Sequence, residues 1–120
     1  MNFGELTGNP IGVLLQLVGT KWKLLIVKEL LIKEHRFNEL KKKLGCTSKV
    51  LTNCLKEMES DGLVLKENDT KITEYYLTDI GYTLRPVVEA MQKWGKEYKR
   101  LRKLMEKYEN ETNLSGTQCI

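Results

Sequence analysis

The segment spanning residues 36–77 limits the fold of this 120-residue chain more than any other part of the sequence. It contains two helix-like stretches, 36–44 and 47–61, which end at Gly45 and Gly62. Glycine is favoured just past a helix because it adopts a left-handed conformation without steric cost. Two strand-like runs follow at 63–67 and 72–77, joined by the polar loop 68–71. This order predicts a helix-turn-helix with a β-hairpin wing, in which the second helix lies in the major groove of DNA.

The rest of the chain adds helices on both sides of this segment. Asn9 and Pro10 are typical of a helix start, and Thr20 can cap a second helix over about 21–32. A last helix is expected after Thr78, with a kink or a new segment at Pro86. We therefore predict a mainly α fold with a small β-hairpin: one domain over residues 1–109 and a disordered polar tail over 110–120.

The second helix of the motif has two chemically different faces. Leu51, Leu55 and Met58 recur at helical spacing and form the inner face. The outer face carries Ser48, Lys49, Thr52, Asn53 and Lys56. Asparagine can pair with adenine, lysine can reach guanine or phosphate, and hydroxyls can reach base edges. A polar outer face alone is equally typical of any surface helix, so the flanking residues decide between the two interpretations.

Cationic side chains flank this helix and favour a DNA interface. Arg36 and Lys42, the latter within a run of three lysines, precede the helix, and Lys71 lies at the tip of the predicted wing. The net charge of +4 also fits an anionic partner, although many small domains are mildly basic. Double-stranded DNA is therefore the expected partner.

The last helix carries a seam of apolar residues spaced alternately by four and three positions. This spacing is typical of a coiled-coil face. Beyond Val87 the helix outruns the core available in a small domain, so these side chains would form an exposed apolar patch unless a partner covers them. A second copy of the chain is the simplest partner, which predicts a homodimer. The predicted interface on this helix contains Met91, Trp94, Tyr98, Leu101 and Met105.

Other functional classes find little support in the sequence. The single histidine, His35, is expected in a loop and has no nucleophile motif, phosphate loop or metal spacing near it, so we expect no enzyme, metal or cofactor. No apolar run approaches the ~20 residues that cross a bilayer. We therefore expect a cytoplasmic protein without membrane contact. Three cysteines fit neither a zinc site nor a disulfide framework, which favours free thiols in a reducing compartment. Cys46 precedes a helix start, where a thiolate is stabilised, and is a candidate redox thiol, whereas Cys54 is expected to be a partly buried filler.

Four blocks of sequence resemble the HxlR-type winged helix-turn-helix regulators, which are related to the MarR group. They are GTKWKLLIVKELL, RFNELKKKLG, SKVLTNCLKEMESDGLV and EYYLTDIGYTLRPVVEAMQKWG, in order and at matching spacing over about residues 9–98. The resemblance implies a homodimeric transcriptional regulator that binds a pseudo-palindromic operator, with a recognition helix at about 48–60 and a wing at about 63–77. It also implies that the first helix joins the dimer interface, through Ile11, Leu14 and Leu15.

Two positions depart from the pattern of the family. Many members carry a cysteine before the proline of the first helix, where this chain has Asn9, so thiol sensing at that position is not available. The usual basic residue of the wing is replaced by Ile72. Two further hypotheses remain: a winged-helix protein-interaction module without specific DNA binding, and an unknown small-molecule effector bound near Trp22, Met91 and Trp94.

Overall fold

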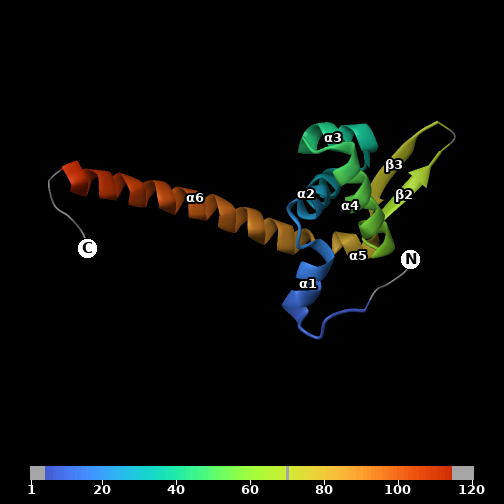
Figure 1. The fold of residues 1–120 in the computed structure, drawn as a ribbon, viewed down its shortest axis with the longest axis horizontal. Coiled ribbons are helices and arrows are strands. Elements are labelled where there is room, and N and C mark those ends of the chain that lie inside the picture. The colour runs from blue at the N-terminus through green and yellow to red at the C-terminus, as the bar shows by residue number, and fades with distance from the viewer. Residues whose placement is uncertain (1–4, 70, 115–120) are drawn as a thin grey trace. The chain divides into compact units, whose positions relative to one another are not determined.

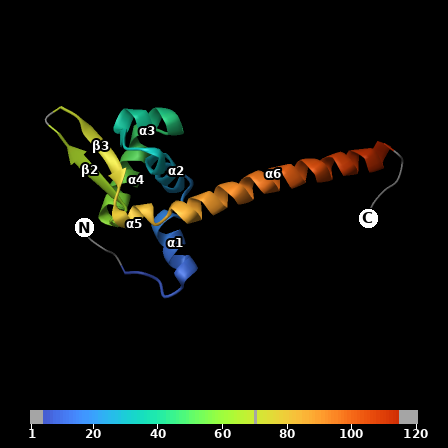
Figure 2. The same cartoon turned by 180° about the vertical axis from the view of Figure 1, so that it is seen from behind.

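The computed structural model describes residues 5–69 and 71–114. It divides into two compact units, one ending at Val88 and one beginning at Glu89 within the last helix. The elements, drawn in Figure 1 and from behind in Figure 2, are α1 (Pro10–Val18), α2 (Lys21–Ile32), β1 (His35–Arg36), α3 (Phe37–Leu44), α4 (Ser48–Ser60), β2 (Val64–Asn68), β3 (Thr73–Leu77), α5 (Asp79–Tyr82) and α6 (Arg85–Leu114).

Short polar side chains set the start of several helices. The Asn9 side chain accepts hydrogen bonds from the backbone N–H groups of Ile11 and Gly12, and the Thr20 hydroxyl accepts one from Lys23. Thr47 caps α4 in the same way through the N–H of Val50. These caps satisfy amide groups that have no partner within the first turn. The predicted helix starts at Pro10 and Lys21 are therefore confirmed.

Two glycines turn the chain at the ends of the motif helices. Gly45 has a φ of 71° and donates its N–H to the Lys41 carbonyl at 2.9 Å, which ends α3. Gly62 follows the C-cap Asp61 with a φ of 77°. Both conformations are left-handed and favour glycine. The tight connection of α3 to α4 and the exit from α4 toward the hairpin follow from these two residues.

The hairpin belongs to a three-stranded antiparallel sheet with the order β1-β3-β2. Strands β2 and β3 pair in the register Val64↔Leu77 through Asn68↔Thr73, as the predicted wing requires. The additional strand β1 pairs His35 with Tyr75. His35 is therefore a buried strand residue and not a loop residue, a correction that depends on pairing with a segment 40 positions away in the sequence.

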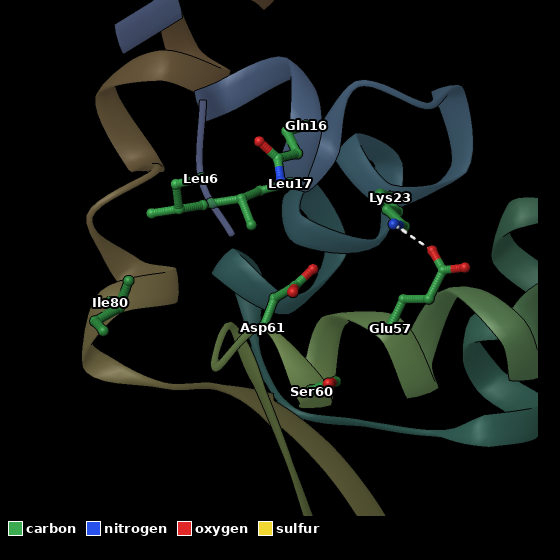
Figure 3. Close-up of a pocket in the computed structure, with 8 residues that line it drawn as sticks. All are labelled: Leu6, Gln16, Leu17, Lys23, Glu57, Ser60, Asp61 and Ile80. Carbon is green, nitrogen blue, oxygen red and sulfur yellow. Dashed lines mark ion pairs between the residues drawn. The ribbon is translucent and has the colours of Figure 1, made fainter. Parts of the chain in front are cut away.

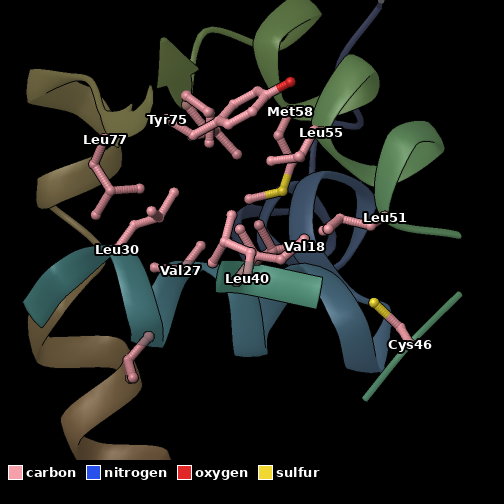
Figure 4. Packing of buried hydrophobic residues seen from close by; sticks show 14 residues of the cluster. Val18, Val27, Leu30, Leu40, Cys46, Leu51, Leu55, Met58, Tyr75 and Leu77 are labelled. Carbon is pink, nitrogen blue, oxygen red and sulfur yellow. The ribbon is translucent and has the colours of Figure 1, made fainter. Parts of the chain in front are cut away.

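The core of the first unit lies between α2, α3, α4 and the sheet. Its fully buried side chains include Ile26, Leu30, Leu40, Leu51 and Met58. Figure 4 shows several of these side chains pointing toward one another from different elements. The inner face predicted for α4 is thus confirmed. On α2 the buried positions are Lys23, Ile26, Val27 and Leu30.

The segment after the hairpin contains two helices. Thr78 caps the short α5, and α6 begins at Arg85 with Pro86 as its second residue. Proline is tolerated there because the first-turn amides have no carbonyl partner. Helix α6 extends to Leu114, so residues 110–114 are helical and the expected tail does not begin at Asn110. This stretch contains neither proline nor glycine, and its polar residues do not stop a helix. The expected tail residues 115–120 lie outside the described residues.

Among the described residues, no single helix has the length and apolar character needed to cross a membrane. Within the same residues, α1 and α2 taken together have the length and composition of a spanning segment, but the chain bends by 86° between them.

Candidate nucleic-acid interface

The polar residues of α4 lie on the side of the helix opposite to the core. Leu51, Leu55 and Met58 are buried, and they fix the rotation of the helix about its axis. Lys49 and Asn53 are exposed as a consequence of that rotation. The remaining predicted residues of the outer face are exposed at Ser48 and Lys56 and half-buried at Thr52. The structure thus brings all five residues to one accessible surface.

Helix α3 and its N-cap supply cations beside this surface, and these cations differ in their ion-pair and hydrogen-bond partners. Arg36 is the N-cap of α3, and its backbone N–H donates to Glu39 Oε1 at 3.2 Å, which lowers the pKa of the Glu39 carboxyl. Lys42 is exposed and makes no ion pair within the described part of the chain. Lys43 is 3.7 Å from Glu29 Oε2. Lys42 is therefore the most available lysine of the run.

The wing carries carboxylates as well as lysines. Its tip is closed by hydrogen bonds between Asp69 and Ile72, with the Asp69 N–H 2.8 Å from the Ile72 carbonyl. Lys71 is exposed at this tip. Glu67 accepts a hydrogen bond from the Tyr76 hydroxyl, an interaction that raises the pKa of Tyr76. Glu74 of β3 lies opposite Glu67 of β2, and Asp69 lies in the loop between the two strands, so the electrostatic field at the wing is mixed rather than basic.

An ion pair between a buried lysine of α2 and an exposed glutamate joins α2 to α4, and the sequence did not reveal it. Lys23 Nζ pairs with Glu57 Oε2, and the side-chain exposure is 8% for Lys23 and 62% for Glu57. A signal for Lys23 exists in the sequence, because positions 23, 26, 27 and 30 share one helical face. Nothing local identifies its partner, which lies on another helix.

The described cysteines are free thiols. Cys46 is 9% exposed and belongs to the hydrophobic core. Its redox role stays a prediction. Cys54 is half-buried and packs against the core, and burial raises the pKa of its thiol. Cys119 lies outside the described residues. Within the described ranges, no group of three or more His, Cys, Asp or Glu residues could hold a metal ion.

The second unit presents the predicted apolar seam on α6. Trp94 is 68% exposed and stacks on Tyr98, with ring centroids 5.3 Å apart. The seam residues Met91, Leu101 and Met105 are exposed as well. In the first unit, Ile11 and Leu15 of α1 are exposed, and Leu14 packs partly against the core. Large exposed apolar patches are uncommon on monomers, and they mark interaction surfaces.

The chain matches a family of known regulators over most of its length. The profile of the HxlR-like helix-turn-helix family matches residues 17–103. The uncharacterized HTH-type transcriptional regulator YdeP of Bacillus subtilis is 37% identical over 99 residues, which cover 79% of this chain and 77% of that protein. An uncharacterized HTH-type transcriptional regulator of Halalkalibacterium halodurans is 42% identical over 92 residues, covering 72% of this chain and 80% of its own length.

Solved structures of similar proteins share the fold. The redox regulator HypR in its oxidized form has a TM-score of 0.70 at 34% identity, covering 74% of this chain and 96% of its own. A putative MarR-family transcriptional regulator from Enterococcus faecalis has a TM-score of 0.68 at 34% identity, covering 83% of this chain and 97% of its own. The elements described above are thus a winged helix with a long C-terminal helix. With the family profile and these relatives, they place the chain in the HxlR-like helix-turn-helix family of DNA-binding transcriptional regulators.

Proposed function

We propose that this protein is a homodimeric transcriptional regulator that reads a pseudo-palindromic DNA operator through α4. The observation that carries the proposal is the exposed polar face of α4, which is held outward by the burial of Leu51, Leu55 and Met58. A helix with this arrangement at the second position of a helix-turn-helix can enter the major groove with its polar side chains toward the bases.

The residues of this face divide by the contacts that their chemistry allows. Asn53 can donate to and accept from an adenine edge, and Lys49 can donate to guanine acceptors. Ser48, Thr52 and Lys56 can reach base edges or phosphates. Arg36 and Lys42 of α3 are exposed cations suited to phosphates. Lys71 is a weaker candidate, because the carboxylates of the wing oppose its charge.

The dimer part of the proposal is supported by the exposed seam of α6. Trp94, Tyr98 and Leu101 present a large apolar area at coiled-coil spacing. Exposed α1 residues, Ile11 and Leu15, are proposed to join the same interface. A two-fold dimer presents two recognition helices, and it therefore favours half-sites about one helical turn, ~34–36 Å, or a multiple apart.

Alanine substitutions on α4 test the assignment of the DNA-reading face. Asn53→Ala and Lys49→Ala are expected to weaken binding to the preferred sequence by about 1–3 kcal/mol each and to relax discrimination at single base pairs. The measurement is a gel-shift titration against a graded set of palindromic duplexes. Lys21→Ala is the matched control, because it removes an exposed lysine that packs on Trp22 outside the motif.

The expected control result is unchanged base preference with at most a small loss of affinity. If Asn53→Ala and Lys49→Ala alter neither affinity nor sequence preference, the assigned face is wrong. Wild-type protein that ignores DNA even at low salt would contradict DNA binding itself and would favour the protein-interaction alternative, because phosphate contacts make affinity strongly salt-dependent.

A further inference from the structure

A pocket of about 420 Å³ opens in the first unit beside the C-terminal end of α4. This volume falls within the range of about 300–1,000 Å³ that is typical of small-molecule sites. Figure 3 shows the side chains around it arriving from the segment before α1 and from α1, α2, α4 and α5. The lining residues are Leu6, Gln16, Leu17, Lys23, Glu57, Ser60, Asp61 and Ile80.

The apolar wall of the pocket is held in place by Gln16. Its side-chain oxygen accepts from the Thr7 N–H at 3.1 Å, and its Nε2 donates to the Glu5 carbonyl at 2.7 Å. These two hydrogen bonds fasten the chain on either side of Leu6 to α1. Leu6, together with Leu17 and Ile80, therefore gives the pocket a positioned apolar lining.

Among the described residues, one carboxylate of the pocket has no partner. The Lys23 ammonium is paired with Glu57, and the Lys23 side chain is 8% exposed. Asp61 makes no side-chain hydrogen bond or ion pair with the described residues. In Figure 3 its carboxylate rises from the end of α4 toward Leu17 and Gln16.

The position of Asp61 in the helix adds to this negative field. Asp61 is the C-cap of α4, and the C-terminal end of a helix carries partial negative charge from its unsatisfied carbonyl groups. Glu57 and Asp61 together also outnumber the single ammonium of Lys23 in the lining. Coulomb attraction in such a partly enclosed space favours a cation over an anion.

We propose that this pocket binds a small amphipathic cation, with a protonated amine at Asp61 and an apolar body against Leu6, Leu17 and Ile80. An organic anion fits poorly, because it would have to displace Glu57 from Lys23 and leave that carboxylate unpaired. Ligand binding in this pocket does not require that the protein binds DNA. If the protein does read DNA through α4, as proposed above, a ligand at the end of α4 is also expected to alter operator binding.

Three ligands that share one skeleton separate the role of charge from that of apolar contact. Isothermal titration calorimetry at pH 7, without DNA, compares 4-phenylbutylamine with 4-phenylbutan-1-ol and 4-phenylbutanoate. The amine is expected to bind about tenfold more tightly than the alcohol, because it adds a charge-assisted hydrogen bond, and the carboxylate is expected to bind most weakly. Equal binding of amine and alcohol, tighter binding of the carboxylate, or no binding of the amine would overturn the proposal.

A matched pair of variants assigns the effect to Asp61. Asp61→Asn keeps the shape of the side chain and removes its charge, and it is expected to weaken amine binding about tenfold while the affinity for the alcohol stays unchanged. Glu59→Gln removes the same charge two residues earlier, outside the lining, and is expected to change amine binding less than about twofold. Equal losses in both variants, or none in Asp61→Asn, would contradict the assigned site.

Discussion

Lys23 is a buried cation of α2 that forms an ion pair with α4. Its ammonium has Glu57 as its ion-pair partner, and the rest of its helical face packs into the core through Ile26, Val27 and Leu30. An ammonium out of water is costly unless it is paired. The spacing of α2 shows that position 23 faces inward, but the sequence alone cannot show which distant carboxylate meets it.

Glu57→Ala is expected to lower the free energy of unfolding by about 1–3 kcal/mol, because it leaves the Lys23 ammonium buried without its partner. Urea denaturation followed by circular dichroism measures the change. Adding Lys23→Met to Glu57→Ala is expected to recover most of the loss, since an apolar side chain of similar length needs no partner. A double variant as unstable as the single one would show that the pairing does not matter.

Helix boundaries were predictable where local chemistry determines them. Asn9, Thr20 and Thr47 cap helices within three residues of their own position, so a short window of sequence contains the whole interaction. Strand β1 was not predictable, because two residues form a strand only through pairing with β3. The exposed outer face of α4 followed from helical periodicity, whereas the mixed charge of the wing depends on which side chains the hairpin register brings together.

Thr78 joins the hairpin to α5 through a single hydroxyl. Its Oγ1 donates to the Gly62 carbonyl at 2.6 Å and accepts from the Gly81 N–H at 3.0 Å. Thr78→Val keeps the shape and removes both bonds, so it is expected to destabilise the protein by about 1–3 kcal/mol in urea denaturation. Thr78→Ser keeps the hydroxyl and serves as the control. Equal stability of the valine and serine variants would contradict this role.

The second unit of the molecule exposes a row of large apolar side chains in the single chain. Its seam exposes Trp94, Tyr98 and Leu101, whereas ion pairs such as Arg100–Glu97 and Arg102–Glu106 occupy other positions on the same helix. The heptad spacing and the length of the helix beyond the core predicted this exposure from the sequence, and the structure confirms it for the single chain. The partner that covers the seam is a proposal, because coiled-coil spacing indicates a contact face and not its occupant.

Charge placed in the seam tests the proposed dimer. Trp94→Glu combined with Leu101→Glu is expected to convert the dimer to a monomer in sedimentation velocity, because carboxylates would be buried without partners. Lys96→Glu with Lys103→Glu is the control, since these exposed residues lie off the seam, and it is expected to stay dimeric. A wild-type protein that sediments as a monomer at micromolar concentration would contradict the proposal.

Selection of bound sequences from random duplex DNA tests the central proposal most directly, because it reports specificity and symmetry together. We expect enrichment of an inverted repeat whose half-sites are ~34–36 Å apart or a multiple of that distance. We also expect binding to weaken steeply as the salt concentration rises, since phosphate contacts release counterions. Recovery of no enriched sequence, or of a single unrepeated site, would contradict a two-fold dimer that reads DNA through α4.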